Sequence, residues 1–145
     1  MVECIFSVTI VELGYILNKK HTIELSVTLT NDANIQKINY EYRGLDKPTN
    51  VLSFPLFERE FLKEHYRLEY LALGDIILSI ETIIEEANKQ EKDFKDHLTH
   101  LIAHSLLHLF GFDHLEDEEA NIMESLEIKI LEKLNIKNPY EIINY

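Results

Sequence analysis

The sequence is short of the features that mark secreted and membrane proteins. It contains a single cysteine, Cys4, which excludes an internal disulfide and a cysteine-rich zinc site. No apolar run approaches the length of a membrane-spanning helix, and Glu3 lies where a secretory signal would be basic or apolar. We therefore expect a cytoplasmic protein with no membrane partner.

Basic residues are also scarce. The chain has 14 Lys and Arg against 26 Asp and Glu, a formal net charge of −12. Phosphate contacts dominate nucleic-acid binding, so this charge argues against DNA and against a broad nucleic-acid surface. The acids are concentrated in 58–70, 81–96 and 116–132, however, while Lys37, Arg43 and Lys47 share one short segment. A local contact with RNA remains open.

The chain also lacks repeats, linkers and low-complexity segments. Its 145 residues, 46% of them hydrophobic and 28% charged, are typical of one globular domain over residues 1–145. Four apolar or β-branched runs predict a small mixed sheet of about four strands: Cys4–Val11, Thr22–Thr30, Val51–Leu56 and Leu73–Ile80. Pro55 favours a sheet edge for the third run. We expect Cys4 to be a small buried residue of the first strand.

Helical patterns fill most of the rest. Asn31 or Asp32 can cap a helix that Gly44 and Pro48 end, and the charged 58–70 segment is predicted to be a helical excursion or a flap. Helices are further predicted over Glu81–Lys92, Phe94–Phe110 and Glu116–Leu134. The Phe94–Phe110 segment is apolar nearly all round, which indicates a central buried helix. Together these elements predict an α+β fold.

Three histidines in and after that helix have the spacing of metal ligands. His104 and His108 are four residues apart, so they point the same way from adjacent helical turns. Gly111 can end the helix in a left-handed conformation and let the chain return His114 to the same ion. Three ligands with an open fourth position describe a catalytic metal site.

The offsets match those of the metzincin proteases at every position but one. Ser105 stands where those proteases have their glutamate base, and a hydroxyl cannot take up a proton near neutral pH. The chain therefore has the ligands of a metal protease without its base. A metalloprotease or amidohydrolase with a base from elsewhere remains an alternative.

Three motifs together resemble the family of the YbeY rRNA maturation factor. They are His100–His114, Tyr42–Pro55 (YRGLDKPTNVLSFP) and Leu73–Ile76 (LGDI), and Met123 followed by Glu127 also fits. The resemblance covers nearly the whole chain in the family's order. The family usually has glycine where this chain has Ser105, and serine is small enough for the same close packing.

The resemblance implies a single-strand-specific, metal-dependent endoribonuclease. It implies action in ribosomal RNA processing, namely maturation of the small-subunit rRNA 3′ end, and in ribosome quality control. Its implied partners are ribosomal RNA and the ribosome or small-subunit proteins. It also implies an α+β fold, a metal on His104, His108 and His114, and catalytic roles for Arg43 and His114.

Several residues keep two interpretations. Arg43 can grip a phosphodiester through two hydrogen bonds, or it can form a surface salt bridge with Glu41 or Asp46. Ser53 and Thr49 can contact substrate or serve the turn and the strand. Other residues near the histidines have open roles: His100 as a partner of a ligand, an RNA donor or a core residue, and Asp113 as an orienting carboxylate or a turn cap.

The hypothesis from these residues is one Zn²⁺ per chain, although three imidazoles also suit Ni²⁺ or another divalent ion. The ion would activate water and polarise a phosphoryl oxygen while Arg43 neutralises the scissile phosphate. A ribosome-associated factor with no enzymatic activity and a structural metal is the second alternative.

Overall fold

The structure is a computed structural model that describes residues 1–17, 20–113 and 115–140. Within these residues the chain forms helices and strands in the order α1, β1, α2, β2, α3, β3, α4, α5, α6. The bounds are α1 Val2–Leu13, β1 Thr22–Thr30, α2 Asp32–Arg43, β2 Val51–Pro55, α3 Arg59–His65, β3 Tyr70–Ser79, α4 Ile80–Lys89, α5 Phe94–Leu109 and α6 Asp117–Lys133. The α+β class is confirmed.

The sheet of the described residues has three strands, so the prediction of about four is wrong. The error lies in Cys4–Val11, which belongs to α1 and leaves Cys4 exposed. β-Branched residues favour strands, but burial of Ile5 and Ile10 against the core overrides that propensity. The Ser7 hydroxyl also donates to the Glu3 carbonyl at 2.9 Å, one helical turn back.

Strand β3 is the centre of the sheet, parallel to β1 and antiparallel to β2. β2 is therefore an edge strand, as Pro55 predicts. Gly74 of β3 has φ +143, and a Cβ there would lie 2.1 Å from the carbonyl oxygen of Phe54. Only glycine allows β2 to approach β3 this closely, so Gly74 helps to place the strand that carries Ser53.

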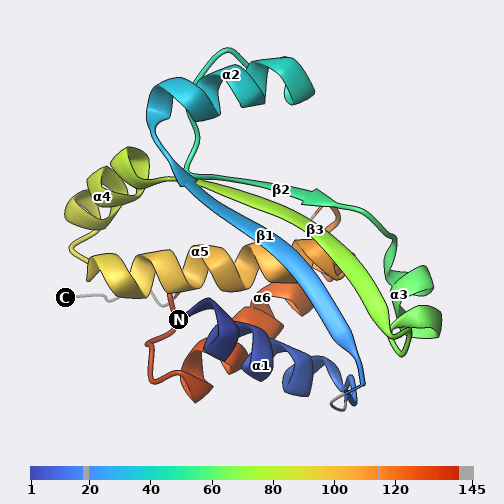
Figure 1. Cartoon of the computed structure of the whole chain (residues 1–145). Helices are drawn as coiled ribbons and strands as arrows, with labels where there is room; N and C mark the ends of the chain where they lie inside the picture. Colours follow the sequence, from blue (N-terminus) through green and yellow to red (C-terminus); the bar gives the residue numbers. More distant parts are fainter. Residues whose placement is uncertain (18–19, 114, 141–145) are drawn as a thin grey trace.

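Helix α5 lies between the sheet and the pair α1 and α6, as Figure 1 shows. It is buried on most sides, which confirms the expected central helix. α2 lies on the other side of the sheet, and its N-cap Asn31 accepts a hydrogen bond from the amide of Asn34 at 2.9 Å. In the described part of the chain, no helix is both long and apolar enough to cross a membrane.

Candidate active site

His104 and His108 lie side by side on the last two turns of α5. The helix begins at the N-cap Asp93, whose carboxylate accepts from the amide of Asp96 at 3.2 Å. It ends at Leu109, and Gly111 follows in the left-handed conformation, with φ +90, that the sequence predicts. The two imidazole rings are 4.6 Å apart between centroids. The spacing of four residues has brought them together as expected.

The orientation of the two rings suits a shared cation. His108 Nδ1 lies 3.0 Å from the carbonyl oxygen of Phe112, and His104 Nδ1 contacts a carboxylate oxygen of Glu127. Both acceptors require a proton on Nδ1, which leaves the lone pair of a neutral imidazole on Nε2. The two Nε2 atoms are 3.0 Å apart. Two lone pairs directed at one point repel each other, and a bound cation removes that repulsion, so these residues fit a metal ion.

Glu127 of α6 supports this arrangement from behind. Its side chain is fully buried and also meets His100 Nε2 at 3.0 Å and the hydroxyl of Tyr140. Burial opposes its ionisation, but hydrogen bonds from His100, His104 and Tyr140 prevail and lower the pKa of Glu127 to about 2. The carboxylate is therefore charged at neutral pH and orients the imidazole of His104, as carboxylates behind metal-bound histidines do.

The third predicted ligand, His114, lies outside the described residues. Across residues 1–17, 20–113 and 115–140, no group of three His, Cys, Asp or Glu side chains is placed to hold a metal. The structure brings His104 and His108 together, and the role of all three histidines as metal ligands stays a prediction. Asp113, which precedes His114, lines the cleft beside His104 and His108.

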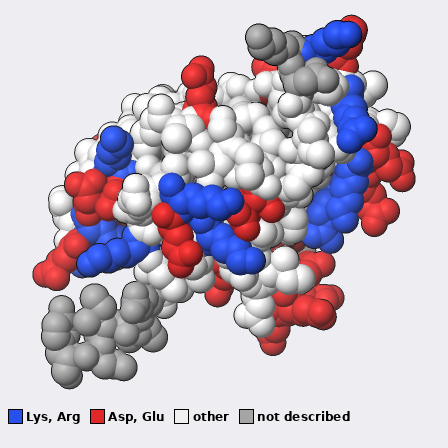
Figure 2. Space-filling model, turned by 90° about the horizontal axis from the view of Figure 1, so that it is seen from below, with Lys and Arg blue, Asp and Glu red and all other residues white. Residues whose placement is uncertain are grey.

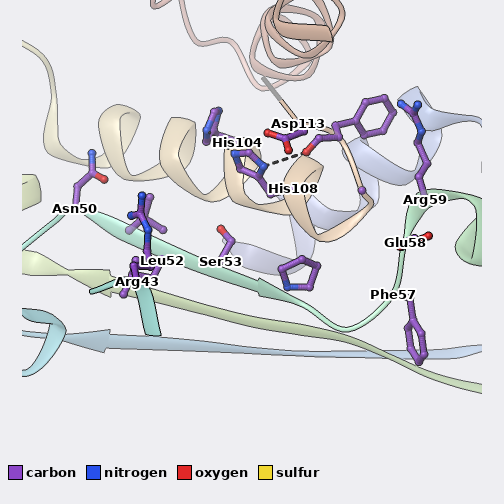
Figure 3. Close-up of a pocket in the computed structure, with 14 residues that line it drawn as sticks. Arg43, Asn50, Leu52, Ser53, Phe57, Glu58, Arg59, His104, His108 and Asp113 are labelled. Carbon is purple, nitrogen blue, oxygen red and sulfur yellow. Dashed lines mark hydrogen bonds between the residues drawn. The ribbon is translucent and has the colours of Figure 1, made fainter. Parts of the chain in front are cut away.

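The two histidines open into a cleft of about 580 Å³. Figure 3 shows them between β2 on one side and the segment after α5 on the other. Arg43 and Arg59 lie at opposite ends of this cleft, with His104 and His108 between them (Figure 3). The carboxylates of Glu58 and Asp113 line the cleft as well. The two cations at its ends, rather than an overall positive charge, are therefore the feature that suits an extended anionic ligand.

Arg43 reaches the cleft from the last residue of α2. Gly44, with φ +71, ends that helix and turns the chain away. Among the described residues Arg43 forms no salt bridge with Glu41 or Asp46, and the Asp46 carboxylate instead accepts from Gln36 at 3.1 Å. The geometry therefore favours the interpretation of Arg43 as a residue directed at a ligand.

Of the three other hydroxyl residues considered, one lines the cleft and two do not. Ser53 lines the cleft from β2, whereas Thr49 is outside the lining among the described residues. Ser105 is fully buried and faces the core rather than the cleft. Its hydroxyl has no hydrogen-bond partner in the described part of the chain. Its burial agrees with the argument that it is no general base.

The sequence analysis did not predict a hydrogen-bonded link between the two walls of the cleft, namely the wall formed by α5 and the wall formed by β2. The Asn50 amide donates to both carboxylate oxygens of Glu86, at 3.0 and 3.3 Å, and His97 Nε2 lies 3.2 Å from the same carboxylate. Asn50 lines the cleft beside β2, while His97 belongs to the helix of the histidine pair. The Asn50 position within the Tyr42–Pro55 motif is the one signal that could have pointed to this contact.

Known proteins resemble this chain over most of its length. A family model described as Endoribonuclease YbeY matches residues 4–135. The Endoribonuclease YbeY of Rhizobium etli is 51% identical over 118 residues, which cover 81% of this chain and 67% of the relative. That of Agrobacterium fabrum is 50% identical over 121 residues, 83% of this chain and 70% of the relative. The solution structure of TM1509 from Thermotoga maritima shows a similar fold, with a TM-score of 0.55 and 22% sequence identity. The matched region covers 97% of this chain and 88% of TM1509.

Proposed function

The chain belongs to the YbeY endoribonuclease family, and on that premise we propose that it cleaves single-stranded ribosomal RNA at the cleft of His104, His108 and Arg43. Membership makes it an RNA-cleaving hydrolase of ribosomal RNA processing. The step that we propose for it is maturation of the small-subunit rRNA 3′ end, together with a role in ribosome quality control.

The observation that carries the proposal is the opposed pair of Nε2 atoms, 3.0 Å apart, with each Nδ1 engaged by a fixed acceptor. His104, His108 and the predicted third ligand His114 would hold one divalent ion. We propose Zn²⁺, because three imidazoles suit that borderline-soft ion, and Ni²⁺ or another divalent ion is the alternative. When bound, such an ion supplies Lewis acidity toward a phosphoryl oxygen and makes water more acidic.

The chain's own residues bind and orient the substrate. Arg43, exposed at one end of the cleft, can place two parallel hydrogen bonds on the scissile phosphate and stabilise the charge that develops there. Glu127 holds the imidazole of His104 with Nε2 toward the cleft, and the Phe112 carbonyl does the same for His108. These contacts fix the ligands before substrate binds.

The protease alternative has less support, because the family and the relatives that the chain matches are endoribonucleases. Ser105 is buried away from the cleft, but the carboxylates of Glu58 and Asp113 line it, so the peptide assay below tests for a peptidase with its base from elsewhere. A ribosomal partner, in contrast, follows from charge. A chain with a net charge of −12 binds free RNA weakly, so we propose that the ribosome or a small-subunit protein presents the substrate in the cytoplasm.

The test uses protein purified without a histidine tag. Its metal content is measured by elemental analysis, and its cleavage of single-stranded RNA, duplex RNA and a peptide library is compared before and after chelation. We expect one divalent ion per chain and cleavage of single-stranded RNA that chelation abolishes and the ion restores. Cleavage that survives complete metal removal, or peptide cleavage without RNA cleavage, would contradict the proposal. A 2′,3′-cyclic phosphate on the product would show internal attack by the RNA's own hydroxyl.

A further inference from the structure

A second cavity, of about 210 Å³, adjoins the cleft at the end where α3 lies. Arg59 and Phe112 line both hollows, so the two share a wall. Sites for whole small molecules usually occupy about 300–1,000 Å³, so this cavity suits one part of a longer ligand that continues from the cleft.

Arg59 packs against the turn that follows α5. Gly111 packs directly on its backbone, since a Cβ on that glycine would lie 2.6 Å from the Arg59 amide nitrogen. The guanidinium carbon lies 4.8 Å from the ring centroid of Phe112, within the range of a cation–π contact. The carbonyl of Phe112 is the acceptor that orients His108. The position of Arg59 is therefore tied to the turn that completes the candidate metal site.

Two basic side chains line the cavity. Arg59 and Lys63 are four residues apart on α3 and both line the cavity. In the part of the chain that the structure describes, neither belongs to a salt bridge. Basic side chains lie along the right-hand edge of Figure 2, with acidic side chains beside them, on the side where α3 lies in Figure 1. In a chain of net charge −12, two unpaired cations beside the cleft point to an anionic ligand.

Aromatic rings complete the lining. Tyr15 and Tyr66 meet edge to face with centroids 4.7 Å apart, and Tyr15 stacks on Phe110 at 5.3 Å. A tyrosine hydroxyl is protonated at neutral pH and can donate a hydrogen bond, and burial raises the pKa of Tyr15 further. Cations interleaved with aromatic rings are the combination that tracks single-stranded nucleic acid.

We propose that Arg59, Lys63 and Tyr15 form a subsite for a nucleotide phosphate next to the scissile bond of single-stranded RNA. The RNA backbone then runs from Arg43, past His104 and His108, to this subsite. The inference rests on the proposed function, because it extends the same cleft. Arg59 and Lys63 act as positioning residues, and their contribution grows with the length of RNA beyond the scissile phosphate.

The kinetic test compares a hexanucleotide with a dinucleotide that has only the scissile phosphate. A charge-assisted hydrogen bond of about 1.5 kcal/mol corresponds to about a tenfold change. We expect Lys63→Ala and Arg59→Gln each to lower the ratio of kcat/KM on the long substrate to that on the short one by about tenfold, mainly through KM. Lys95→Ala is the control, since it removes the same charge from an exposed position in the first turn of α5. A ratio equal to that of the control in both variants would overturn the subsite.

A binding test keeps the subsite separate from the cleavage reaction. Fluorescence anisotropy with a labelled hexanucleotide is measured for the metal-loaded Arg43→Ala protein, alone and combined with Lys63→Ala or Lys95→Ala. We expect about tenfold weaker binding for the Lys63 combination and a loss of about 0.7 in the salt slope, the value for one phosphate contact on a single strand. Equal affinities in the two combinations would refute the subsite. If the wild-type protein cleaved neither substrate while the two combinations still differed in affinity, the proposed function would be refuted and the subsite would stand.

Discussion

The two walls of the cleft hold their functional side chains in opposite ways. On the α5 wall, His104 and His108 are tied at Nδ1 to acceptors, one of which is the fully buried Glu127. On the opposite wall, Arg43 stands exposed at the end of α2 with no salt bridge among the described residues. One wall is fixed before any ligand arrives, whereas the other ends in an adaptable cation.

The difference follows from what each wall has to bind. A metal ion takes the lone pair of an imidazole in one direction only, so a small rotation of the ring loses the bond. A guanidinium offers five donors on a flexible stem and can follow a phosphate. The comparison predicts that changes on the α5 wall remove the metal, while changes on the Arg43 wall spare the metal and slow the reaction.

The largest effect is expected from the ligands themselves. We predict that His104→Ala, His108→Ala or His114→Ala each abolishes metal binding, because the remaining ligands cannot complete the site. Occupancy of the wild-type protein should fall as the solution is acidified, since an imidazole must be neutral to bind. Elemental analysis and metal titration measure both. A His108→Ala protein with full occupancy would remove the basis for distinguishing the two walls.

The next effect belongs to the opposite wall. We predict that Arg43→Ala lowers RNA cleavage by about 10²–10³-fold, the usual loss of one transition-state donor, and leaves metal content and circular dichroism unchanged. Arg43→Lys should restore only part of the rate, because an ammonium keeps the charge without the two-pronged geometry. If Arg43→Ala cleaved RNA at the wild-type rate, a role at the phosphate would be excluded.

A smaller effect is expected behind the α5 wall. We predict that Glu127→Gln lowers metal affinity by about 10–100-fold, the range observed when a carboxylate behind a ligand is removed. Competition between the metal-loaded protein and a chelator of known affinity measures the change in metal affinity. Glu132→Gln, exposed on the same helix, is the matched control. Equal affinities for the two variants would show that Glu127 is only a core residue.

The smallest effect is expected at Ser105. We predict that Ser105→Ala keeps most of the activity and raises the free energy of unfolding by about 1 kcal/mol, because it removes a buried hydroxyl that lacks a partner in the described structure. Ser105→Gly should leave the free energy of unfolding close to the wild-type value, since it removes the same hydroxyl but glycine within a helix is less stable than alanine by about 1 kcal/mol. Chemical denaturation and an RNA cleavage assay test both variants. An activity loss in Ser105→Ala as large as that of a ligand variant would reveal a role for the hydroxyl.

Local patterns in the sequence were sufficient for much of the fold. The helices at 80–89, 94–109 and 117–133 begin and end within one turn of their predicted bounds, and the strands at 22–30, 51–55 and 70–79 lie where alternation and β-branching predict them. The periods of helix and strand are local, so they can be recognised without the tertiary structure. Cys4–Val11 shows the limit, because burial against α5 and α6, and not propensity, makes that segment helical.

The candidate site divides in the same way. The sequence by itself determined that His104 and His108 share a helix face and that Gly111 ends the helix behind them, because a spacing of four residues sets direction in any α-helix. Only the tertiary structure decided what stands behind and opposite them: Glu127 of α6, Arg43 of α2, and Arg59 with Lys63 of α3. These contacts join residues far apart in the chain, and they depend on how the helices pack on the sheet and on one another, which no local period encodes.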